Sequence, residues 1–287
     1  MRRLLLVALL LLAACSSTPG AATSDDVTLD LDGRPFRLHV PAVAAEKAPL
    51  VVLLHGYTSN ADEQESYFKL TAESDRRGFL YAMPEGTTNQ EGKRFWNATP
   101  ACCDFFNSGM DDSTYLVRLI DTVAAKHPVD PARVYFVGHS NGGFMALRMA
   151  CDHADRVTAV VSLAGAATAD PAQCQPSRPV SVLQIHGTSD RTILYEGSTN
   201  ARRPYPSAEG TLALWRRLDG CADRADTSTA PIDLDATLSG AETTVTAWHD
   251  GCGGGTRAEL WSIRDGSHIP ALSPSFATAV ADFLLAR

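Results

Sequence analysis

A five-residue segment near the middle of the chain, Gly138-His139-Ser140-Asn141-Gly142, most constrains what this sequence can fold into. A run of β-forming residues at 133–137 precedes it, and a helix-forming run at 144–149 follows it. In a G-x-S-x-G turn between a strand and a helix the serine sits at a strained corner, so the flanking residues must be small. The sequence therefore predicts a nucleophile elbow that lifts the Ser140 hydroxyl off a sheet, in preference to a chance glycine-rich turn.

Residues 1–14 have the pattern of an export signal. Arg2 and Arg3 precede an unbroken apolar run at 4–14, which is too short to span a bilayer as a mature helix. The segment Leu12-Ala13-Ala14-Cys15 resembles a bacterial lipobox, which implies cleavage before Cys15 and lipidation of that cysteine. The alternative is an ordinary signal peptidase site with an incidental cysteine. We therefore expect an exported lipoprotein, anchored at the outer membrane or cell surface or released outside the cell.

The rest of the chain predicts one domain behind a tether. Residues 15–26 are small and polar without apolar periodicity, as in a flexible tether, and 27–287 contain no internal repeat or second linker. With 45% hydrophobic residues, a chain of this length can bury one large core. Without the signal, 23 basic residues face 33 acidic ones, so the net charge falls from −8 to about −10. This charge argues against nucleic acid and anionic membrane surfaces as partners.

The cysteines also fit an exported chain. Setting Cys15 aside leaves an even number, which favours disulfides over metal ligation, and the zinc alternative lacks C-x-x-C or nearby histidine spacing. We predict a disulfide between Cys221 and Cys252, because each follows a glycine and together they bracket a polar segment. The pattern leaves the other four unassigned, namely Cys102, Cys103, Cys151 and Cys174.

Short β-type runs alternate with longer helix-type runs, which is the pattern of parallel strands joined by crossover helices. The predicted strands are 37–40, 50–54, 79–83, 133–137, 157–163, 180–185, 244–248 and 258–263. The predicted helices are 62–77, 111–126, the one after the elbow, 208–218 and 275–285. We expect a single α/β domain with a mostly parallel sheet and helices on both faces.

Two loops supply partners for the serine. A serine hydroxyl needs an imidazole to take its proton and a carboxylate to fix that imidazole's tautomer. Asp190 follows the strand 180–185 and His268 follows the strand 258–263, and sites in open parallel sheets form at this carboxyl edge. The chain order Ser, acid, His is that of α/β-hydrolases. We predict the triad Ser140, Asp190 and His268, with a simple turn aspartate as the alternative for Asp190.

Hydrolysis also needs hydrogen-bond donors for a developing oxyanion. The backbone N–H of Asn141, directly after the serine, is one predicted donor. The second is the N–H of Tyr57 in the loop after strand 50–54, where Gly56 permits the turn. Trp96 either lines the substrate cleft or belongs to the core.

Six segments carry a joint pattern: His55-Gly56, Trp96-Asn97 through Asp111-Asp112, Asp130 through the elbow, His186 through Asp190, Gly220-Cys221 and Gly251-Cys252. Jointly these segments resemble secreted esterases of the polyhydroxybutyrate depolymerase, feruloyl esterase and acetylxylan esterase family, including LpqC-like lipoproteins. The resemblance implies an α/β-hydrolase fold, the triad named above, an ester substrate and no metal or organic cofactor. The family commonly has several glycines before the base and Trp-Pro after it, whereas this chain has Ile269-Pro270 after His268.

The expected function is a lipid-anchored serine ester hydrolase acting through an acyl-enzyme. Short-chain, hydroxycinnamoyl, acetyl-carbohydrate and hydroxyalkanoate esters are the candidate substrates, with soluble esters favoured over a crystalline polymer because only a short segment follows His268. Two alternatives stay open. One is a serine peptidase of the prolyl-oligopeptidase type, and the other is a surface-binding lipoprotein that keeps the fold without the activity.

Overall fold

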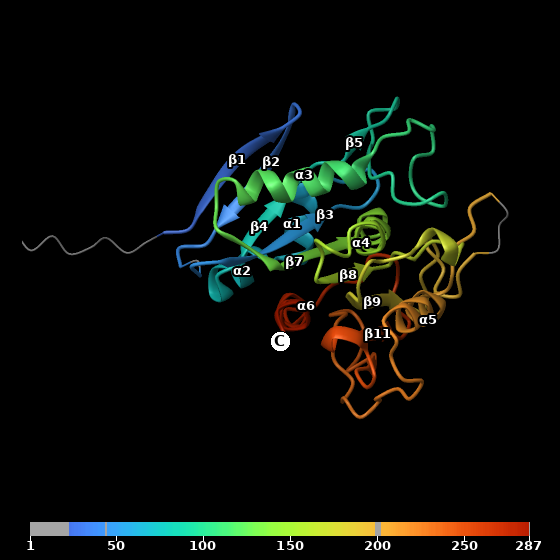
Figure 1. Ribbon diagram of the computed structural model, residues 1–287. Coiled ribbons are helices and arrows are strands. Elements are labelled where there is room, and N and C mark those ends of the chain that lie inside the picture. The colour runs from blue at the N-terminus through green and yellow to red at the C-terminus, as the bar shows by residue number, and fades with distance from the viewer. Residues whose placement is uncertain (1–22, 44, 199–201, 287) are drawn as a thin grey trace, which may run out of the picture.

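A nine-stranded mixed sheet forms the centre of the molecule (Figure 1). The computed structural model describes residues 23–43, 45–198 and 202–286. The predicted signal, Cys15 and the tether up to residue 22 therefore lie outside the described residues. In sheet order the strands are β1 (Asp25–Leu31), β2 (Arg34–Val40), β4 (Leu80–Met83), β3 (Ala48–Leu54), β7 (Val129–His139), β8 (Ala159–Leu163), β9 (Ser181–Gly187), β11 (Ala258–Ile263) and β10 (Thr243–Trp248).

The middle of the sheet is parallel and its two ends are antiparallel. Strands β4, β3, β7, β8, β9 and β11 pair in parallel, while β1, β2 and β10 pair antiparallel with their neighbours. Two short strands, β5 (Thr87–Thr88) and β6 (Arg94–Phe95), form a separate hairpin between β4 and α3. All parallel strands end at one edge, so the loops that follow β3, β7, β8, β9 and β11 meet there.

Helices cover both faces of the sheet, as predicted. Apolar residues of α3 (Asp112–Ala124), α4 (Asn141–Asp152) and α5 (Ala208–Leu218) pack in one core cluster, and those of α1 (Ala61–Phe68) and α6 (Phe276–Leu285) pack in another. Strand β3 contributes apolar side chains to both faces of the sheet: Leu50 and Val52 belong to the first cluster, and Val51 and Leu53 to the second. Both faces therefore need a covering layer of helices. Figure 1 shows α3 and α6 on opposite sides of the sheet.

The predicted helix 62–77 is two helices in the structure. Helix α1 ends before Lys69, whose φ of 57° is left-handed, and α2 (Thr71–Arg77) follows after Leu70. The Glu65 carboxylate accepts hydrogen bonds from the backbone N–H groups of Leu70 (3.3 Å) and Thr71 (3.0 Å). This carboxylate satisfies donors at the start of the second helix, and helix-period patterning in the sequence does not reveal such a break.

The sequence pattern also missed β1, β5 and β6. Strand β1 begins at Asp25, so the last two residues of the predicted tether belong to the sheet. It is an edge strand with exposed acidic residues, and only Leu29 and Leu31 are buried. Within the described ranges, no helix is both long enough and apolar enough to cross a bilayer.

The described part of the chain contains three disulfides. The predicted pair Cys221 and Cys252 is bonded and links the segment after α5 to the β10–β11 connection. The four cysteines that the sequence left unassigned form the bonds Cys102–Cys103 and Cys151–Cys174. The second of these ties α4 to the short 3₁₀-helix Pro171–Gln173.

Candidate active site

Ser140 lies at the sharp corner between β7 and α4. Its backbone has φ 54° and ψ −118°, a conformation that residues with side chains rarely adopt, and its N–H donates to the Leu163 carbonyl oxygen at 2.8 Å. A Cβ atom on Gly138 would collide with the Gly142 backbone, and one on Gly142 would collide with Leu54. Only glycine fits on either side of the turn, which is the close approach that the sequence predicted.

The structure brings the three predicted triad residues into one hydrogen-bonded chain. The Ser140 Oγ lies 3.0 Å from the His268 Nε2, and the His268 Nδ1 lies 2.7 Å from the Asp190 Oδ2. Because an ionised carboxylate only accepts, the Nδ1–H donates to Asp190 and the bare Nε2 faces the serine hydroxyl. The two side chains come from the loops after β9 and β11, which are parallel neighbours in the sheet.

Asp190 is held as a carboxylate in one orientation. Its Oδ1 accepts hydrogen bonds from the backbone N–H groups of Thr192 (2.8 Å) and Ile193 (3.0 Å), which leaves Oδ2 to face His268. Burial alone would raise the pKa of Asp190, but hydrogen bonds from His186 and His268 hold this pKa well below its usual range. The group is therefore ionised at neutral pH and fixes the tautomer of His268.

His186 is a contact of Asp190 that sequence reasoning missed. Its Nδ1 accepts from the Gln184 side-chain amide (3.1 Å), so its Nε2–H points to the Ile193 carbonyl oxygen (2.8 Å) and lies 3.3 Å from the Asp190 Oδ2. The only sequence signal was its place four residues before the predicted acid. This imidazole supports the loop that carries Asp190.

His139, directly before the serine, was also missed as a contact of His268. Its Nε2–H donates to the His268 carbonyl oxygen at 2.9 Å, and the two rings lie 5.0 Å apart. Burial lowers the pKa of His139 to about 4, so the ring is neutral near pH 7. A neutral ring at this position places no positive charge beside His268.

Acid should destabilise the fold through two buried histidines, His139 and His55, because burial lowers the pKa of each to about 4. The unfolded chain binds these protons near pH 6.5, so the contribution of the two histidines to the free energy of unfolding falls as pH drops from about 6.5 to about 4 and does not change above that window. Each contributes up to about 3 kcal/mol to this loss. Urea unfolding at pH 7 and 4.5 tests this, and His139→Gln should show the smaller drop. An equal drop in both proteins would contradict the assignment to His139.

The two predicted oxyanion donors, the N–H groups of Asn141 and Tyr57, belong to segments next to the serine. Asn141 is the first residue of α4, where an N–H has no acceptor within the helix, and the Tyr57 N–H bonds to no other described residue. A Cβ atom placed on Gly56 would be 3.7 Å from the Ser140 Cβ, so the Gly56–Tyr57 turn lies against Ser140. The Asn141 side chain is occupied elsewhere, because it exchanges hydrogen bonds with the Trp96 backbone at 2.7 and 2.8 Å.

The prediction that Trp96 lines the substrate cleft is wrong. The residue is fully buried, its Nε1–H donates to the His55 carbonyl oxygen at 3.1 Å, and its ring lies 5.2 Å from the His55 ring. Asn141 holds the Trp96 backbone in place, so the ring turns into the core beneath the loop after β3. Of the two alternatives that the sequence left open, the structure supports the core.

A surface groove begins one helical turn from the serine. Its volume is about 600 Å³, and it runs between α4, the loop before α3 and the segment after β8. The Phe144 N–H donates to the Ser140 carbonyl oxygen at 3.0 Å, so this wall of the groove starts about 6 Å along the helix axis from the nucleophile. The walls include Asn97, Thr99, Asn107, Phe144, Arg148 and Thr168.

The sheet and the elbow define the class of protein. A mostly parallel sheet with helices on both faces, a serine at a strand-to-helix corner, and an acid and a histidine on later loops are the features of an α/β-hydrolase. The sequence profile of the family described as Esterase PHB depolymerase matches residues 35–231, and the chain belongs to this family. The matched stretch ends before His268, so the histidine is placed by the geometry above.

Relatives and solved structures agree with this family. The chain is 34% identical over 188 residues to a putative esterase, NocK, of Nocardia uniformis subsp. tsuyamanensis, with 64% of this chain and 53% of that protein covered. It is 26% identical to feruloyl esterase B of Piromyces equi, with 77% and 39% covered. The matched part of the chain thus spans about half or less of the length of these two relatives. The fold matches an acetyl xylan esterase from Aspergillus awamori with a TM-score of 0.63 at 14% identity, covering 91% of this chain and 98% of that one.

Proposed function

We propose that this protein is a serine carboxylic-ester hydrolase that works through an acyl-enzyme. The observation that carries the proposal is the chain of hydrogen bonds from the Ser140 Oγ through His268 to Asp190, with the Gly56–Tyr57 turn and the start of α4 next to the serine. This arrangement supplies a nucleophile, a base of fixed tautomer and a site for negative charge, and these are the requirements of acyl transfer.

The geometry supports a two-step reaction. The Ser140 Oγ bonds to the ester carbonyl carbon as its proton passes to the His268 Nε2, and the N–H groups of Asn141 and Tyr57 hold the oxyanion. When this intermediate collapses, the C–O bond to the alcohol breaks and His268 returns the proton to the leaving oxygen. Water then repeats the sequence on the acyl-enzyme and releases the acid with Ser140 restored.

The substrates we propose are hydroxycinnamoyl or acetyl esters of carbohydrates, short-chain esters and hydroxyalkanoate oligomers. The names of the relatives and of the family support these classes. The groove beside α4 supports a substrate with one bulky group, because its volume falls in the range of small-molecule binding sites.

A substrate panel tests the proposed activity. Initial rates should be measured on p-nitrophenyl esters of increasing chain length, methyl ferulate, acetylated xylan, hydroxybutyrate oligomers and a set of peptide amides. We expect ester turnover without amide cleavage. Amide cleavage with the esters untouched would favour the peptidase alternative. No turnover, with no labelling of the folded protein by a fluorophosphonate, would favour the surface-binding alternative.

Thr168, a half-buried residue in the wall of the groove, allows a test of whether bulky esters bind there. Thr168→Trp should fill part of the groove and lower kcat/KM for the best bulky ester about tenfold, which corresponds to about 1.4 kcal/mol. The value for p-nitrophenyl acetate should not change, because acetate and its leaving group do not need that volume. Thr168→Ala, which widens the groove, is the matched control. Equal losses on both esters would show that bulky substrates bind elsewhere.

We also propose that the chain is exported and anchored by a lipid on Cys15. The signal pattern at 1–14 supports this, and the three disulfides fit an oxidising compartment. Mass spectrometry of the mature protein from membranes should find a diacylglyceryl group on an N-terminal Cys15. A mature chain that begins at another residue would contradict the anchor.

A further inference from the structure

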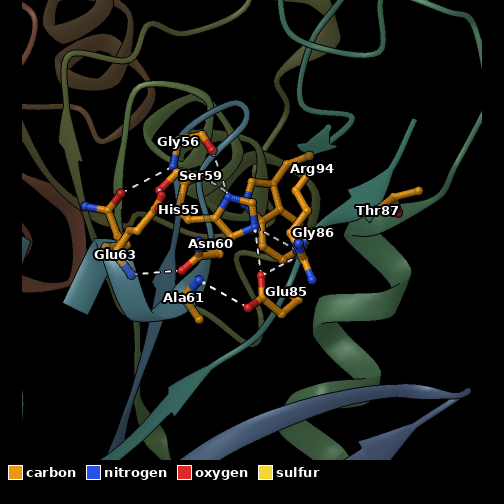
Figure 2. A network of polar contacts seen from close by, with 12 residues as sticks. His55, Gly56, Ser59, Asn60, Ala61, Glu63, Glu85, Gly86, Thr87 and Arg94 are labelled. Atoms are coloured by element: carbon orange, nitrogen blue, oxygen red, sulfur yellow. Dashed lines mark hydrogen bonds and ion pairs between the residues drawn. The ribbon is translucent and has the colours of Figure 1, made fainter. Parts of the chain in front are cut away.

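His55 is a buried imidazole next to the site to which the reaction proposed above gives no role. It is the first residue after β3, and its side chain is fully enclosed between the Trp96 ring and the segment after β4. Figure 2 shows this side chain between the loop that carries Gly56 and the loop that carries Gly86. The ring therefore joins two loops at the carboxyl edge of the sheet.

Both ring nitrogens of His55 have fixed partners. The Gly86 backbone N–H lies 2.9 Å from Nε2, and the Gly56 carbonyl oxygen lies 2.8 Å from Nδ1. Because a backbone N–H only donates, Nε2 is the acceptor and the proton resides on Nδ1, which donates to Gly56. Burial lowers the pKa of His55 to about 4, so the neutral form required by this pattern is present at pH 7.

The bond to the Gly56 carbonyl also determines where the next N–H points. The same carbonyl oxygen accepts from the Ser59 N–H at 3.2 Å, so two donors hold it on one side of the loop. The Gly56–Tyr57 peptide is trans, and in a planar trans peptide the C=O and the following N–H point in opposite directions. The Tyr57 N–H is therefore directed away from His55, and it is one of the two candidate oxyanion donors.

Other hydrogen bonds fix the loop on either side of the Gly56–Tyr57 peptide, whereas the peptide oxygen itself is bonded by His55 and Ser59. The Gly56 N–H donates to the Gln64 Oε1 at 3.3 Å, and the Thr58 N–H donates to the Arg94 carbonyl oxygen at 2.9 Å. These contacts locate the loop but do not bond either group of the peptide between Gly56 and Tyr57. Rotation of that peptide is opposed chiefly by the bond from the His55 Nδ1, which donates to its oxygen at the shorter distance.

We propose that His55 is a positioning residue of the oxyanion hole, which holds the Gly56 carbonyl so that the Tyr57 N–H points at the developing negative charge. This inference rests on the proposed esterase function. It assigns to His55 an effect on the transition state rather than on substrate binding, because the oxyanion forms only as the serine attacks. The N–H of Asn141 belongs to α4 and is unaffected.

Three variants separate this role from simple packing. In His55→Asn the amide nitrogen can occupy the place of Nδ1 and donate to Gly56, whereas in His55→Gln the amide reaches the place of Nε2 and contacts Gly86 instead. We expect kcat to fall about 10²- to 10³-fold in His55→Gln and His55→Ala with KM nearly unchanged, the size expected when one oxyanion donor is lost. His55→Asn should recover at least tenfold of that loss. A trifluoromethyl ketone forms a tetrahedral oxyanion on the serine. Its inhibition constant should therefore rise by about the factor by which kcat/KM falls.

Several outcomes would overturn the proposal. Equal kcat in His55→Asn and His55→Gln, or a loss that appears in KM, would assign His55 to packing. A wild-type protein without serine-dependent ester turnover would instead contradict the esterase function itself, and the role of His55 with it. One measurement needs no variant. ¹⁵N spectra of the wild-type protein at pH 7 should show the His55 proton on Nδ1, and a proton on Nε2 would contradict the hydrogen bond from His55 to the Gly56 carbonyl.

Discussion

Replacing Ser140 with alanine is expected to lower kcat for ester hydrolysis by about 10⁴- to 10⁶-fold. The hydroxyl is the atom group that would form the acyl-enzyme, and neither His268 nor the oxyanion donors can replace it as a nucleophile. The residual rate should come from substrate binding and the backbone donors alone. The fold should be nearly unaffected, because the Ser140 side chain makes one hydrogen bond, to the His268 Nε2.

The measurement is the steady-state rate on the best ester of the panel, together with labelling by a fluorophosphonate. Wild-type protein should be labelled at Ser140, and the alanine variant should not be labelled. Ser228→Ala, in an exposed loop away from the site, is the matched serine control and should retain wild-type turnover within about twofold. Near-normal turnover in Ser140→Ala would contradict the proposed mechanism outright.

The central fold could be predicted because its strands are buried on both faces. Strand β3, for example, has seven buried residues in succession, and such a run followed by an amphipathic helix indicates a crossover in a parallel sheet. The same rule fails at edges. Strand β1 is mostly exposed, and the short β5–β6 hairpin has too few residues to show a period. The break between α1 and α2 depends on one carboxylate, which no periodicity reports.

The candidate site was predictable where chemistry depends on chain order and strand ends. The elbow, Asp190 and His268 each follow a strand that could be recognised, so their convergence follows from the sheet. The supporting histidines were not predictable, because the roles of His55, His139 and His186 depend on which backbone group faces each ring nitrogen. The sequence left Trp96 between cleft and core for a similar reason, since its orientation depends on the hydrogen bond from its backbone N–H to the Asn141 side chain.

Asp190→Asn is expected to lower kcat/KM by about 10⁴-fold at neutral pH, and the orientation of the side chain explains why. The N–H groups of Thr192 and Ile193 require an acceptor, so the asparagine oxygen should take the place of Oδ1. Its NH₂ group then occupies the place of Oδ2, opposite the His268 Nδ1 at 2.7 Å. Two donors cannot face each other at that distance, so the imidazole must carry its proton on Nε2. In that tautomer it cannot accept the proton of Ser140.

Kinetics of a matched pair of variants test this argument. Asp111→Asn replaces the carboxylate that caps α3, where asparagine caps equally well, and its turnover should equal that of the wild type. A loss smaller than tenfold in Asp190→Asn would show that the carboxylate does not determine the tautomer of His268. The double variant Ser140→Ala/Asp190→Asn provides a second check, because residues that act as one unit are not additive. It should be no slower than Ser140→Ala alone, since a base of the wrong tautomer costs nothing once the proton it would accept is gone.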